Sequence, residues 1–133
     1  MRPYRFFFLL LALSFSSPAL AQQRRWKQIG VTGSNNPVFV DPKSVSKANG
    51  VITATLRVQF TEPVKAPSGT WTSSRTVASF DCAKRLVLVK ENTYYVDEKR
   101  NKIAERKVPK IPGWGPALGG ALPGVAMQYL CTQ

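Results

Sequence analysis

The stretch NGVITATLRVQF, residues 49–60, decides the fold class of this chain. Asn49-Gly50 is the pair that a tight type I′ hairpin turn requires, because both central residues of that turn need a positive φ. After the turn, apolar side chains from Ile52 to Phe60 alternate strictly with Thr, Arg and Gln. A period of two with one polar face predicts a half-buried antiparallel strand.

Further short strands are predicted on both sides of this hairpin. They fall at residues 24–30, 38–41, about 74–82, 86–90, 93–96 and 103–108. Turn or loop composition separates them at 32–37, 62–69 and 97–102, and residues 109–120 contain too much Pro and Gly for regular structure. Pro123 suits the first turn of a short helix that continues over 125–130. Because no helical pattern lies between the strands, we predict an α+β, mainly β fold: a single antiparallel sheet of about five to six strands with a short C-terminal helix.

The N-terminus has the pattern of a secretory signal. Arg2 and Arg5 precede an apolar run over 6–15, and Ala19-Leu20-Ala21 matches a small-x-small cleavage site. We expect a signal peptide over residues 1–21, with a buried N-terminal helix as the alternative, and one domain over 22–133. The product would be exported to the periplasm, the cell surface or the exterior. No cysteine stands directly after the cleavage site, so a lipid anchor is not expected.

The two cysteines of the chain are Cys82 and Cys131. Export would place both in an oxidising compartment, where a pair is expected to form a disulfide. A helix of about two turns is marginal alone, and this bond would tie it to the strand that carries Cys82.

The order of motifs resembles the surface-adhesin protein E-like family of bacterial exported proteins. The resemblance covers nearly all of the chain after the signal. It rests on Trp26, the run VFVDPKSV (38–45), Asn49-Gly50, the Ser-Arg stretch 73–75, FDCA (80–83), Tyr94-Tyr95 and the closing helix with Cys131. The resemblance implies an antiparallel sheet with a disulfide-held C-terminal helix, and adhesins that bind host matrix proteins. The named adhesins are lipid-anchored, whereas this chain lacks the lipidation cysteine.

The residues that usually carry catalysis are missing. The chain has no histidine, which removes the usual general base and the commonest metal ligand. Paired cysteines leave no thiolate, and the adjacent Asp97 and Glu98 fall in a predicted turn. A Ser/Lys pair among Ser44, Ser46 and Lys47 stays as a minor alternative. We therefore expect no enzyme activity, no cofactor and no metal.

Basic residues are the main candidates for binding, because the formal net charge is +12. The densest group lies within residues 99–110, where Glu105 is the one acidic residue. Its members are Lys99, Arg100, Lys102, Arg106, Lys107 and Lys110. Lys84 with Arg85 forms a second group, and Arg24, Arg25 and Lys27 form another. The alternative is that these cations form a solvated hairpin tip or protect a sheet edge from aggregation.

The aromatic residues are expected to divide between core and surface. Trp26, Phe39, Phe60 and Phe80 alternate with polar positions and are predicted core residues. Trp71 and Trp114 are expected in Pro/Gly loops, as binding candidates or as lids over the core. Tyr94 and Tyr95 would point to opposite faces of a strand.

These features favour a non-catalytic, adhesin-like binding protein of the cell envelope with a basic surface. Its partner would be a protein, an acidic glycan or a lipid headgroup, at the envelope or in the host matrix. The alternative is a structural or accessory subunit of an envelope complex that pairs through a sheet edge. Nucleic acid is not expected, because the aromatics are not interleaved with the basic group.

Overall fold

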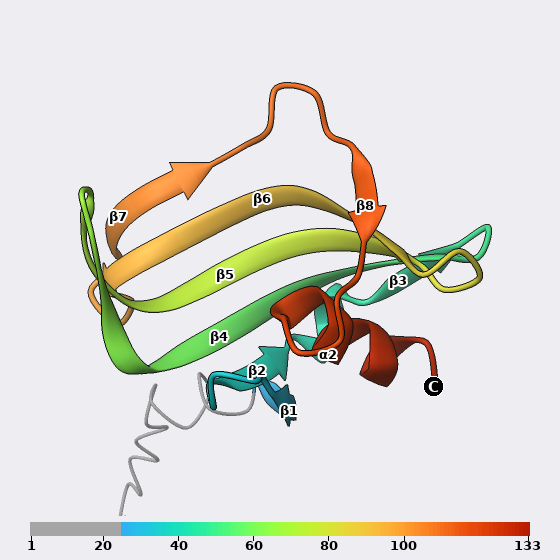
Figure 1. Ribbon diagram of the computed structural model, residues 1–133, viewed down its shortest axis with the longest axis horizontal. Helices are drawn as coiled ribbons and strands as arrows, with labels where there is room; N and C mark the ends of the chain where they lie inside the picture. The colour runs from blue at the N-terminus through green and yellow to red at the C-terminus, as the bar shows by residue number, and fades with distance from the viewer. Residues whose placement is uncertain (1–24) are drawn as a thin grey trace, which may run out of the picture.

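The computed structural model describes residues 25–133, so the predicted signal lies outside the described residues. One open antiparallel sheet runs in the order β1-β2-β4-β5-β6-β7, and β3 and β8 add to β4 and β6 (Figure 1). The strands are β1 (Lys27–Val31), β2 (Pro37–Val40), β3 (Ser46–Ala48), β4 (Val51–Ala66), β5 (Gly69–Asp81), β6 (Leu86–Asp97), β7 (Lys102–Lys107) and β8 (Trp114–Pro116). A 3-10 turn η1 (Pro42–Ser44) and the helix α2 (Leu122–Leu130) complete the described elements. The predicted fold class is confirmed.

The long strands β4, β5 and β6 form the centre of the sheet. Strand β4 pairs with β5 up to Ala66 opposite Gly69, and β5 pairs with β6 up to Asp81 opposite Leu86. Both pairs of neighbouring strands are therefore joined by short connections. The turn before β4 is formed by Asn49 and Gly50, with φ of 53° and 76°. The sequence prediction of a positive-φ turn at this point is confirmed.

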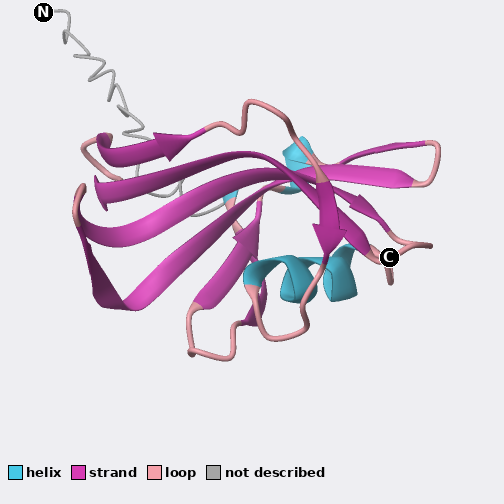
Figure 2. Cartoon of the chain, turned by 45° about the horizontal axis from the view of Figure 1, so that its top comes forward, coloured by secondary structure: helices cyan, strands magenta, loops and turns pink. Residues whose placement is uncertain are grey.

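The hydrophobic core lies between one face of the sheet and α2 (Figure 2). The apolar positions of the β4 alternation, Ile52, Ala54, Leu56 and Val58, are all buried. Ala78 and Phe80 of β5 extend this face, and α2 covers it with Ala126, Met127 and Leu130. The period of two in β4 therefore identified the side of the sheet on which the core forms.

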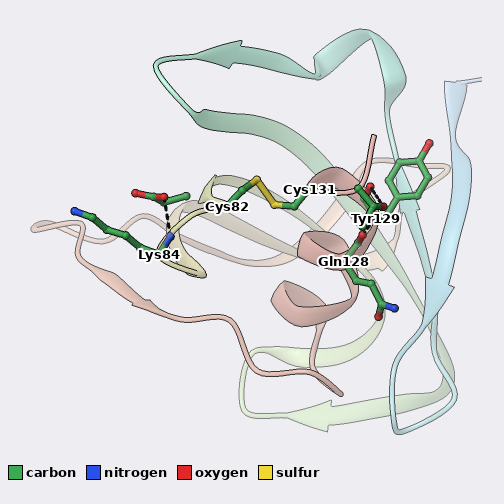
Figure 3. The surroundings of a disulfide bond; sticks show 7 residues. Cys82, Lys84, Gln128, Tyr129 and Cys131 are labelled. Atoms are coloured by element: carbon green, nitrogen blue, oxygen red, sulfur yellow. Dashed lines mark hydrogen bonds between the residues drawn. A yellow bond between two sulfur atoms is a disulfide. The ribbon is translucent and has the colours of Figure 1, made fainter.

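One covalent and one steric constraint fix the position of α2. A disulfide joins Cys82, directly after β5, to Cys131 at the end of the helix, with 5.6 Å between the Cα atoms (Figure 3). The helix has Pro123 in its first turn, as predicted. A Cβ on Gly124 would lie 1.8 Å from the carbonyl oxygen of Leu118, so only glycine permits this approach of the preceding segment.

Two predicted loops contain strand. Residues 62–69 were expected to be a loop, but β4 runs to Ala66 and β5 begins at Gly69. Pro63 falls inside an interruption of the ladder between Gln59 and Val64, where a residue without an N–H is tolerated. The Pro/Gly segment 109–120 likewise contains β8, whose Gly115 lies opposite Val87 of β6. No helix within residues 25–133 has the length and apolarity needed to cross a membrane.

Candidate functional site: an anchored basic turn

The sheet face opposite α2 carries arginines and aromatic rings. Phe39 pairs with Arg57 across β2 and β4, and Arg57 pairs with Arg75 across β4 and β5. The guanidinium of Arg57 lies 5.5 Å from the centroid of the Phe39 ring. The guanidinium of Arg75 lies 5.3 Å from the Trp26 ring and 5.4 Å from the Tyr95 ring. These are cation–π distances, so this face is a layer of stacked cations and rings.

This layer corrects the prediction that Trp26 and Phe39 belong to the core. Phe39 alternates with the buried Val38 and Val40, which places its ring on the other face. Phe60 is half-buried and outside the core cluster. Of the four aromatics assigned to the core, Phe80 alone is part of it.

Glu98 lies at the centre of the arginine layer. Its carboxylate accepts hydrogen bonds from Arg57 Nε at 2.7 Å, Arg75 Nε at 2.6 Å and Ser73 Oγ at 2.7 Å. The side chain is only 11% exposed. Burial raises the pKa of Glu98, but the hydrogen bonds from Ser73, Arg75 and Arg57 outweigh it and hold the pKa below its ordinary value. Glu98 is therefore charged at neutral pH and holds two strands and the β6–β7 connection together.

The residues that follow Glu98 form an exposed basic turn. We call Lys99, Arg100 and Lys102 the basic turn; all three side chains are exposed. Its backbone is fixed by the Asn101 N–H, which donates to the Glu98 carbonyl at 3.0 Å, and by Asn101 in the left-handed region at φ 53°. Arg100 lies 3.7 Å from Asp97, while Lys99 and Lys102 form no ion pair in the described part. The turn thus presents cations from an anchored backbone.

The other predicted basic residues do not join this turn in one surface. Arg106 pairs with Glu91 at 2.7 Å, a contact that lowers the pKa of Glu91 chiefly through the Arg106 hydrogen bond. Lys107 lies 3.8 Å from Glu105. Lys84 and Arg85 lie in the β5–β6 connection, at the opposite end of β6. Lys110 is exposed in the β7–β8 connection.

Trp71 and Trp114 are both in strands, not in loops. Trp71 of β5 stacks on Tyr94 of β6 with 3.9 Å between ring centroids. The Lys107 ammonium lies 5.9 Å and 5.6 Å from these two rings. Tyr94 and Tyr95 have different surroundings, as expected for neighbours on a strand. Trp114 of β8 is partly exposed.

Most acidic side chains of the protein form ion pairs with its own basic residues. All seven lie in the described region, and five of them, namely every one except Glu62 and Asp81, take part in ion pairs. The cations of the described region without an ion pair are Lys27, Lys43, Lys47, Lys65, Lys84, Arg85, Lys90, Lys99, Lys102 and Lys110. The positive charge without an acidic partner therefore lies mostly in the turns and near strand ends, with Lys90 inside β6 as an exception.

The family model described as "Surface-adhesin protein E" matches residues 26–132. The chain belongs to the surface-adhesin protein E family. Comparison with curated proteins gives no match.

Solved structures of protein E share the fold of this family member. Crystal form II of Haemophilus influenzae protein E has a TM-score of 0.56 at 15% identity, covering 81% of this chain and 87% of that one. Protein E from non-typeable Haemophilus influenzae has a TM-score of 0.53 at 16% identity, covering 81% and 76%. At these identities the likeness is one of fold.

Sequence reasoning missed the residue that organises this adhesin-family surface. Glu98 was interpreted as one acid of a polar turn, and nothing in DEKRNK distinguishes it from Asp97. The signal that could have indicated it is the polar face of β4 and β5, where Arg57 and Arg75 need a counter-ion. In residues 25–133, no group of three His, Cys, Asp or Glu could hold a metal ion.

Proposed function

We propose that this protein is a non-catalytic, exported, adhesin-like protein of the cell envelope, whose basic turn binds a polyanionic partner. Membership of the surface-adhesin protein E family supports the adhesin-like role. An acidic glycan is the partner class that fits best, because a chain of repeated charges can contact several cations at once. Each contact is weak and screened by salt, so affinity comes from several together.

One observation carries this proposal. Glu98 turns inward to Arg57 and Arg75, while Lys99 and Lys102, its neighbours on the same turn, stay exposed and without an acidic partner in the described part. The turn is therefore pre-organised, and a ligand need not pay for ordering its backbone. Arg100 adds a third charge whose contact with Asp97 is long and exposed.

Heparin chromatography tests the proposal. We expect Lys99→Glu with Lys102→Glu to elute from heparin at clearly lower salt than the wild type, and Arg100→Glu to lower it further. The matched control is Lys43→Glu with Lys47→Glu, which changes the net charge equally at η1 and β3. Equal loss in both double variants would mean that only net charge matters, and would contradict a site at the basic turn.

A second candidate is an accessory subunit that pairs through the edge of β7. In the described region β7 pairs with β6 on one side only, and its Ile103 is exposed. An open edge strand is a template for a partner strand. A strand-paired complex would persist in size-exclusion chromatography at high salt, whereas glycan binding through the basic turn would be lost.

A further inference from the structure

The connection between β7 and β8 and the residues just after β8 expose large apolar side chains. We call residues 108–118 the apolar loop. Exposed fractions are 57% for Val108, 90% for Ile111, 45% for Trp114 and 65% for Leu118. In Figure 1 the chain between β7 and β8, which contains Val108 and Ile111, rises away from the strands. Trp114 begins β8, and Leu118 follows it. Such a concentration of exposed apolar groups in one segment indicates an interaction site.

The apolar loop is held at its C-terminal end. Trp114 pairs with Leu88, and Pro116 pairs with Leu86. The Ala117 N–H donates to the Arg85 carbonyl at 3.3 Å. The pairing of β8 with β6 therefore brings the end of the loop beside the β5–β6 connection.

Cations border the apolar loop at both ends. Lys107 and Lys110 lie at its start, while Lys84 and Arg85 adjoin its end through the contact of Ala117. The Lys84 side chain extends away from the disulfide (Figure 3). Exposed Lys90 sits in the β6 bulge, between the partners of β7 and β8. The sequence contains no acid after Glu105.

We propose that the apolar loop docks the protein on an anionic lipid surface. Ile111, Trp114 and Leu118 enter the boundary between headgroups and acyl chains, and the bordering cations contact the headgroups. Basic residues near an anionic surface are attracted to it, and an Ile or Leu side chain that enters the acyl boundary removes its apolar surface from water. Tryptophan is the residue enriched at this depth of a membrane.

The composition of the loop favours lipid over the other occupants. Pro109, Pro112 and Pro116 have no N–H, so fewer backbone donors lose water when the loop enters a lipid interface. A protein partner would require a closely packed complementary surface, whereas these exposed side chains are spread from the β7–β8 connection to the residue after Ala117. An acidic glycan would use the cations and leave the apolar groups exposed. The inference depends on the proposed function only in taking the partner to be an envelope anion, since the basic turn is a separate site.

Vesicle sedimentation tests the inference. We expect the oxidised protein to bind vesicles of phosphatidylcholine mixed with phosphatidylglycerol and to bind phosphatidylcholine alone far more weakly. Ile111→Asp should weaken binding at least about tenfold, because it removes an apolar contact and adds a repelled charge. Fold is not at risk, because the Ile111 side chain is 90% exposed. Lys43→Glu with Lys47→Glu is the charge control and should weaken binding less than Lys107→Glu with Lys110→Glu.

Tryptophan quenching locates the contact. Brominated phosphatidylcholine in the mixed vesicles should quench the protein fluorescence, and Trp114→Phe should remove most of that quenching, whereas Trp71→Phe should not. No binding to the mixed vesicles, or binding that Ile111→Asp leaves unchanged, would overturn the inference. A dimer in solution that Ile111→Asp dissociates would assign the loop to a second copy and would overturn it as well.

The two proposed sites fail separately. Ile111→Asp should leave heparin retention unchanged, and Lys99→Glu with Lys102→Glu should reduce vesicle binding no more than the charge control. If the wild type binds the mixed vesicles but does not bind heparin, the proposed function is rejected and the lipid inference stands.

Discussion

Glu98 is the residue that anchors the basic turn to the sheet, because its carboxylate accepts hydrogen bonds from Arg57 and Arg75. We expect Glu98→Gln to lower the free energy of unfolding at neutral pH by about 2 kcal/mol, since hydrogen bonds to a charged group contribute ~1.5–3 kcal/mol. Urea unfolding measures this, with Glu62→Gln as the control, because Glu62 is exposed and forms no ion pair in the described part.

The pH dependence of this effect has a defined sign. The folded pKa of Glu98 is lowered, so its stabilisation is present above the unfolded pKa and is lost as the pH falls through the folded value. The difference between wild type and Glu98→Gln should therefore be full at neutral pH and should shrink below the ordinary range of a glutamate. A difference that stays constant down to the acid transition would contradict the role of the charge.

For single residues, the sequence predicts which side chains are exposed better than it predicts which side chains contact one another. The exposure of residues 99, 100 and 102 follows from local composition, because charged side chains in a polar turn stay in solvent without any tertiary contact. The stacking of Arg75 between Trp26 and Tyr95 was not predicted, because it joins residues from three distant parts of the chain. Alternation shows that Phe39 faces away from its neighbours Val38 and Val40, but which side is buried is decided by the position of α2.

Among the elements, α2 is the one most constrained by a single residue. A Cβ at position 124 would meet Leu118 and Gly119 backbone atoms at 1.8–2.6 Å, and backbone cannot yield as a flexible side chain can. We expect Gly124→Ala to destabilise the protein by roughly 1–3 kcal/mol, as overpacking does, despite the better helix propensity of alanine. Thermal unfolding measures this.

Gly119→Ala is the matched control for that helix prediction, because its Cβ would meet no atom within 4 Å. It should leave the melting temperature unchanged or raise it slightly. Equal stability of the two variants would mean that the segment before α2 packs more loosely than the structure indicates.

Elements with strong local signals were predictable, and those that depend on pairing were not. The turn at Asn49-Gly50, the alternation of β4 and the proline-led helix follow from local chemistry. The outer half of the β4–β5 hairpin was predicted as loop because of Pro63 and Pro67. It is strand because Val64, Lys65 and Ala66 find partners in Trp71, Thr70 and Gly69, and a partner strand cannot be seen in local composition.

For the molecule as a whole, the central question is what holds one short helix on a large sheet. Helix α2 packs against β1, β2 and β4, and it covers only part of one sheet face (Figure 2). Its nine residues are too few for a stable isolated helix. The apolar contacts of Ala126, Met127 and Leu130 and the Cys82–Cys131 bond must therefore act together.

The disulfide closes a sequence separation of 49 residues, which includes β6, β7 and β8. Chain entropy assigns such a closure about 4 kcal/mol of stabilisation. We expect Cys131→Ser and the double variant with Cys82→Ser to lose a similar free energy in urea unfolding, and reductant to bring the wild type to the same value. Amide exchange should localise the effect, because α2 freed from its tether opens more readily than β4 and β5. If the α2 amides exchanged as slowly in the variant as in the wild type, packing alone would hold the helix, and the tether would act only on the unfolded chain.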